Sequence, residues 1–90
     1  MYRFVYSLEK NEKLKQERKI SFEEIIELIN SEHLLGIIEH PNQDQYPGQD
    51  IFIIAIAGYA WLVPHVQVGS EIFLKTAFPS RKHTKIYMES

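Results

Sequence analysis

The sequence predicts an α+β fold, in which two N-terminal helices and a short C-terminal helix pack on a four-stranded, largely antiparallel sheet. Helix-forming segments with capping residues occupy the first third and the end of the chain, whereas apolar runs separated by short turns fill the middle. The chain has 90 residues, of which 44% are hydrophobic, and no cysteine. This size and composition predict one domain, residues 1–90, with no disulfide.

The N-terminal third predicts a short strand and two helices. Tyr2–Tyr6 is aromatic-rich and alternating, which favours a strand. Residues 8–19 are mostly helix formers with little apolar content, so we expect a surface helix with solvated lysines. Ser21 and Glu24 form a capping box, and the isoleucines behind it fall at helical spacing. These two features predict a second helix over Phe22–Asn30.

The remainder predicts a meander of strands and a terminal helix. Gly58-Tyr59 is the expected turn of the central hairpin. Pro64 cannot donate to a ladder, so its strand should be broken, bulged or near an edge there. Pro79 ends the last strand, and Ser80 caps the C-terminal helix. The four predicted strands of the meander are 34–39, 51–57, 60–66 and 71–78.

The net charge of −2 conceals a segregation of charge along the chain. All ten Lys and Arg lie in residues 1–19 or 75–90, and the 55 residues between them carry eight acids and no base. The three segments have net charges of +3, −8 and +3. We predict that the first and last helices converge on one side of the sheet, around Arg81, and form a basic face for a polyanion; the alternative is two solvated helix faces.

Several classes of protein are not expected. No apolar run reaches the length of a membrane span and the N-terminus lacks a signal-peptide core, so we expect a cytoplasmic protein. The four histidines lack metal-ligand spacing, which predicts no metal site. The glycine motifs of nucleotide sites are also missing, so no cofactor is expected.

The last segment carries the candidate chemistry. Arg81 and Lys82 follow the final strand at a helix start, where backbone donors and cations make an anion site. His65 lies near Lys75 if their side chains share a face, and neighbouring cations would lower its pKa and suit it as a base. The plainer alternatives are a half-buried strand histidine, surface cations, and core packing for Tyr87.

Both ends of the chain resemble the BrnT family, toxins of bacterial type II toxin–antitoxin pairs. A basic helix containing Lys10 precedes Ile20-Ser21-Phe22-Glu23-Glu24, as at the start of that family. Ser80-Arg81-Lys82-His83-Thr84 is similar to the family's Ala-Arg-Lys-Ala-Thr. The chain departs from the family at Ser7-Leu8, where Trp-Asp is usual, and at Glu17-Arg18-Lys19, where Lys-His-Gly is usual.

The resemblance implies a RelE-like fold and RNA cleavage without a metal, by attack of a 2′-hydroxyl on the adjacent phosphate. It implies that Arg81 binds the phosphate, with Lys82 or Lys75 beside it. His65, on geometry alone, is the base candidate and Tyr87 a weaker one. The RNA backbone would be held by Lys10, Lys13, Arg18 and Lys85.

The same resemblance implies a protein partner. An antitoxin that binds DNA, typically through a ribbon-helix-helix domain, would neutralise the toxin in a hetero-oligomer. The alternative function is a non-catalytic interaction domain of the same fold, which binds a protein through an acidic or aromatic surface.

Overall fold

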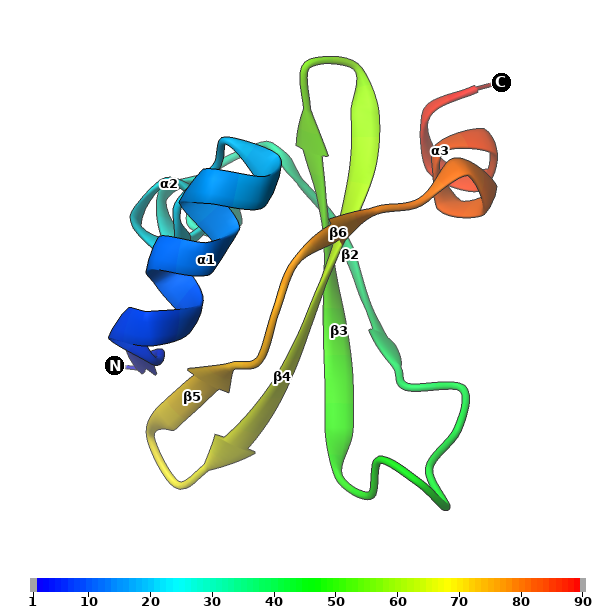
Figure 1. Cartoon of the computed structure of the whole chain (residues 1–90). Helices are drawn as coiled ribbons and strands as arrows, with labels where there is room; N and C mark the ends of the chain where they lie inside the picture. Colours follow the sequence, from blue (N-terminus) through cyan, green and yellow to red (C-terminus); the bar gives the residue numbers. More distant parts are fainter. Residues whose placement is uncertain (1, 90) are drawn as a thin grey trace.

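Three helices and a six-stranded sheet make up the fold in the computed structural model, which describes residues 2–89 (Figure 1). This agrees with the predicted α+β class, although the sheet has six strands where four were predicted. No helix within the described residues is long and apolar enough to cross a membrane. In chain order the elements are β1 (Arg3–Val5), α1 (Leu8–Arg18), α2 (Phe22–Ile29), β2 (Leu34–Glu39), β3 (Gln49–Ile56), β4 (Tyr59–Val68), β5 (Glu71–Leu74), β6 (Phe78–Pro79) and α3 (Arg81–Met88).

The sheet has the strand order β1-β5-β4-β3-β2, and β6 also pairs with β4. The pairing of β1 with β5 is parallel and the other pairings are antiparallel. The β3–β4 hairpin turns at Ala57 and Gly58, one residue earlier than predicted. Both residues have positive φ, 51° and 78°, as a two-residue turn of type I′ requires. Tyr59 is therefore the first residue of β4.

The central hairpin buries side chains on both faces of the sheet. Phe52, Ile54 and Val63 join the larger hydrophobic cluster, to which α1 and α2 contribute. Ile53 and Leu62, which alternate with them, join the smaller cluster, against which Phe78 and Met88 of the C-terminal segment pack. Figure 1 shows α1 and α2 on one side of the strands and α3 on the other. The prediction that the two basic helices converge on one side is therefore wrong.

The strand predicted over residues 71–78 is divided opposite Pro64. β5 pairs with His65–Val68, and β6 pairs with Trp61 and Leu62. Residues 75–77 thus face only two residues of β4, which is the count of a β-bulge. β4 itself runs unbroken through Pro64, so the irregularity lies in its partner. Beyond the bulge the chain crosses the sheet and carries α3 to the far face (Figure 1).

The bulge also recruits a side chain from α1. The carbonyl of Pro64 accepts a hydrogen bond from the Lys75 backbone N–H at 2.8 Å. In the register of β5 these two residues would exchange a second bond, but proline has no N–H to donate. The Lys75 carbonyl instead accepts from the Lys10 ammonium at 3.4 Å.

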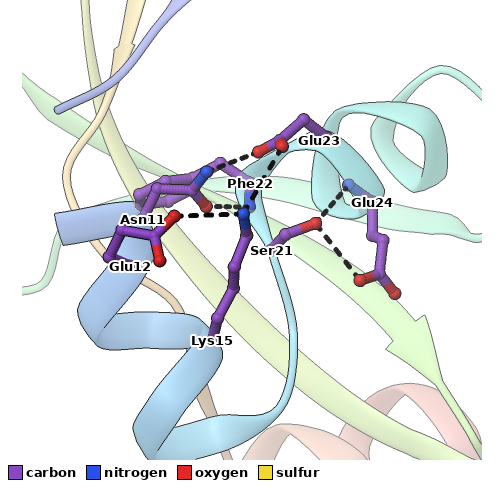
Figure 2. Close-up of polar contacts among 7 residues, drawn as sticks. All are labelled: Asn11, Glu12, Lys15, Ser21, Phe22, Glu23 and Glu24. Atoms are coloured by element: carbon purple, nitrogen blue, oxygen red, sulfur yellow. Dashed lines mark hydrogen bonds and ion pairs between the residues drawn. The ribbon is translucent and has the colours of Figure 1, made fainter. Parts of the chain in front are cut away.

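A buried amide joins α1 to α2 (Figure 2). Asn11 is 3% exposed; its Oδ1 accepts from the Phe22 backbone N–H at 2.8 Å, and its Nδ2 donates to Glu23. The ammonium of Lys15 lies 3.3 Å from the Glu12 carboxylate and 3.9 Å from the Glu23 carboxylate. Lys15 is therefore ion-paired, whereas the sequence predicted solvated lysines on this helix. These contacts fix the side of α1 that faces the sheet.

Replacing Asn11 tests this joint. Asn11→Ala leaves the buried N–H of Phe22 without its partner, so we expect a loss of about 1–3 kcal/mol in the free energy of unfolding. Urea denaturation measures it. Gln16→Ala, at an exposed position of the same helix, is the control and should change stability by less than about 0.5 kcal/mol. Equal stability of the two variants would contradict the role of Asn11.

Candidate functional site

A cavity of about 220 Å³ lies between α1 and the bulge after β5. Lys10, Lys13 and Glu17 recur at helical spacing and so present one stripe of α1 to this cavity. Leu14 and Phe22 form its apolar floor. Its complete lining is Lys10, Lys13, Leu14, Glu17, Arg18, Phe22, Lys75 and Thr76, which includes four cations and one acid.

None of the four cations of this cavity forms an ion pair with another described residue. Within residues 2–89 the ion pairs of Lys and Arg involve only Arg3, with Glu71, and Lys15, with Glu12 and Glu23. Lys75, which is far from α1 in sequence, comes to the cavity because the bulge places it beside Lys10. The cavity therefore concentrates positive charge from two distant segments.

A second cavity, of about 390 Å³, adjoins the first. The two share Lys10, Lys75 and Thr76, and the second extends to His40 and Tyr46 in the loop between β2 and β3. The rings of His40 and Tyr46 are 4.4 Å apart between centroids, with an interplanar angle of 34°. We call these two neighbouring cavities together the basic groove.

His40 and Tyr46 were not among the candidates from the sequence. Their only signal was a histidine and an aromatic residue within a polar loop. Nothing in that pattern indicates that the loop lies beside Lys75. The loop comes there through the register of β3 on β4, which brings Gln49 opposite Val66, close to the bulge.

His65 lies away from the basic groove. Its registered partners are Leu74 and Asp50, so it does not share a face with Lys75. The imidazole is 4% exposed and stacks on Phe52, with 3.8 Å between ring centroids. Nδ1 lies 3.1 Å from the carbonyl of Val63, which can only accept, so Nδ1 carries the proton.

The surroundings of His65 also differ from those predicted. It lines a cavity of about 590 Å³ whose lining contains no Lys or Arg. Burial lowers the pKa of His65 below its ordinary value, while the Val63 carbonyl and the Asp50 carboxylate act in the opposite direction. The direction of the shift matches the prediction, but its cause is burial and not neighbouring cations.

The remaining predicted site residues lie on α3. Arg81 and Lys82 occupy the exposed first turn, after the Ser80 hydroxyl, which accepts from the His83 backbone N–H at 3.2 Å. Lys85 is also exposed. None of these three cations lines the basic groove. The Arg81 end is therefore a basic region outside the basic groove, on the helix that packs against the smaller hydrophobic cluster.

Two contacts attach α3 to the sheet. Thr84 Oγ1 accepts from the Ala60 backbone N–H at 2.8 Å and donates to the Ser80 carbonyl at 2.7 Å. The ring of Tyr87 lies 3.2 Å from the point where a Cβ at residue 36 would be, so it packs closely over Gly36 of β2. Tyr87 thus has a packing role, and its ring is directed at β2.

The basic groove has the composition of a site for a polyanion, with unpaired cations on one side and two aromatic rings at one end. Comparison of the chain with models of protein families, with curated proteins and with solved structures finds no match in any of the three.

The burial of His65 predicts a pH-dependent stability. Because its folded-state pKa is below that of the unfolded chain, the unfolded state binds more protons as the pH falls through about 6.5, and the folded state loses stability. His65→Phe, which keeps a ring on Phe52, should reduce the loss measured by urea denaturation between about pH 7.5 and pH 5.5. The loss attributable to one such group is at most about 1.4 kcal/mol per pH unit.

Val66→Ala, next in the chain, is the control for that experiment. It removes a half-buried side chain but leaves the imidazole in place, so stability should fall at every pH with the wild-type slope. Some slope should remain in His65→Phe as well, because burial and Lys82 also lower the pKa of His83. An unchanged slope in His65→Phe contradicts the prediction.

Proposed function

We propose that the chain binds RNA in the basic groove and cleaves it without a metal, as the toxin of a type II toxin–antitoxin pair. The observation that carries the proposal is the meeting of four cations from α1 and the bulge, none of them ion-paired within the described residues. Such groups bind a phosphodiester backbone and stabilise the charge that gathers on a phosphate during cleavage. The likeness of the two chain ends to the BrnT family points to the same class, with a RelE-like fold and an antitoxin partner.

The cleavage step needs a nucleophile, an acid and a base. The 2′-hydroxyl loses its proton to water and attacks the adjacent phosphorus, a cyclic phosphate forms, and the bond to the 5′-oxygen breaks as that oxygen takes a proton from water. Lys10 and Lys75, which line both parts of the groove, are positioned to hold the phosphate. No proton-transferring role for His65 follows from this placement, since it opens into another cavity.

His40 is the histidine that the groove contains. Its Nδ1 accepts from the Asn42 backbone N–H at 3.1 Å, so in the neutral ring Nε2 carries the proton. Such a ring can donate a hydrogen bond from Nε2 to a phosphate oxygen. We therefore assign His40 to hydrogen bonding with the phosphate, beside Lys10 and Lys75.

The resemblance assigns the phosphate instead to Arg81, with Lys82 beside it. These residues stand at the exposed start of α3, which packs on the face of the sheet opposite to α1, so they do not meet the cations of α1. The two assignments make opposite predictions for substitutions at Arg81 and Lys75, so one set of variants separates them.

An interaction domain without catalysis remains the second candidate, and the cavity of about 590 Å³ beside His65 favours it. Phe4, Phe52 and His65 line this cavity, and at its rim Tyr2 is 59% exposed and Ile37 is 57% exposed. Apolar surface of this kind is typical of contacts with proteins. The same surface suits an antitoxin if the chain is a toxin.

Incubating the purified protein with RNA at low salt and in EDTA tests the proposed function. We expect cleavage that leaves cyclic phosphate ends and is lost by about tenfold or more in Lys10→Ala and in Lys75→Ala, because each removes a cation from the phosphate. Arg81→Ala should cleave normally, and expression of the active protein alone should arrest growth.

Three other outcomes are informative. Loss of cleavage in a folded Arg81→Ala variant, with Lys75→Ala active, moves the site to α3. Loss of cleavage in both Arg81→Ala and Lys75→Ala, together with a lowered melting temperature, indicates a folding defect, which circular dichroism detects. Intact RNA under all conditions contradicts cleavage and favours the interaction domain.

A further inference from the structure

We propose that the basic groove takes single-stranded RNA, with one unpaired base stacked on the ring pair of His40 and Tyr46. This inference rests on the proposed function, because it names the form of RNA that the groove receives. The rings stand at one end of the groove, and the cations Lys10 and Lys75 separate them from Lys13 and Arg18 at the other end. A strand laid along the groove thus meets cations and then aromatic rings.

The two parts of the groove share three lining residues. Lys10, Lys75 and Thr76 line both cavities, so a ligand held by these two lysines lies at the edge of the cavity that His40 and Tyr46 line. Lys10 is itself held there by the Lys75 carbonyl. A phosphate at the lysines therefore has an adjoining cavity of about 390 Å³ for the base of the same or the next nucleotide.

The loop that carries the rings is held in shape by its own hydrogen bonds. The Gln43 amide nitrogen donates to the carbonyls of His40, at 2.9 Å, and Gln49, at 3.0 Å. Its oxygen accepts from the Gly48 backbone N–H at 3.1 Å. The Tyr46 N–H donates to the Asn42 carbonyl at 2.9 Å. The ring pair is therefore built before a ligand binds, which reduces the entropic cost of binding.

The chemistry of the rings selects the kind of nucleic acid. Tyr46 is 38% exposed although it is a large aromatic residue, and His40 covers part of its ring. Aromatic faces stack on bases of any sequence, but only where those bases are unpaired. In a duplex the bases already stack on one another, so the ring pair adds nothing to the binding of double-stranded RNA.

Binding of 2′-O-methyl RNA tests the inference separately from cleavage, because this RNA lacks the attacking hydroxyl. A fluorescent single-stranded 2′-O-methyl octanucleotide is titrated with protein, and inorganic polyphosphate is used as a competitor without bases. Tyr46→Ala should weaken binding of the oligonucleotide by about tenfold, as the loss of one stacked base does, and leave polyphosphate binding unchanged. Tyr46→Phe should bind like the wild type. Lys75→Ala should weaken the binding of both ligands.

The outcomes separate the inference from the proposed function. If Tyr46→Ala binds the oligonucleotide normally while Lys75→Ala does not, the stacked base is wrong and RNA binding stands. If Tyr46→Ala weakens polyphosphate equally, the ring pair only supports the fold of the loop, and the inference is also overturned. If Tyr46→Ala weakens the oligonucleotide alone but the wild type never cleaves RNA, the inference holds and the cleavage fails.

Discussion

The missing N–H of Pro64 is the constraint from which the arrangement of the C-terminal half follows. Pro64 lies in the middle of the sheet, where it accepts from Lys75 and cannot return the bond. The partner strand bulges there, and the free carbonyl of Lys75 binds the ammonium of Lys10. Because Pro64 has no N–H, the Lys75 carbonyl is free to accept from Lys10, which connects α1 to this strand. Beyond the bulge the chain crosses the sheet towards α3 (Figure 1).

The sheet divides the positive charge that the sequence places at its two ends. α1 and α3 pack on opposite faces, each against its own hydrophobic cluster. Of the cations near α1, Arg3 and Lys15 are ion-paired. Lys10, Lys13, Arg18 and Lys75 form no ion pair within the described residues and line the basic groove. The positive charge of the groove therefore comes from cations that no carboxylate neutralises.

The elements of the fold were largely predictable, because their signals are local. Ser21 and Ser80 cap α2 and α3 as expected, and both helices begin at the residue that follows the cap. The site was less predictable. The face on which the His65 side chain lies depends on strand register, since a shift of one residue would turn it to the other face. His40 and Tyr46 depend on where a loop falls relative to a distant strand.

By itself, the sequence determined the helix ends, the period of each strand and the absence of a donor at Pro64, because capping, alternation and proline chemistry act within a few residues. Only the tertiary structure decided the face on which each helix packs, the partners of each cation and the meeting of Lys10 with Lys75. These depend on strand pairings between residues far apart in the chain. A charge count or a motif records which residues are present, whereas the register of the sheet determines which of them meet.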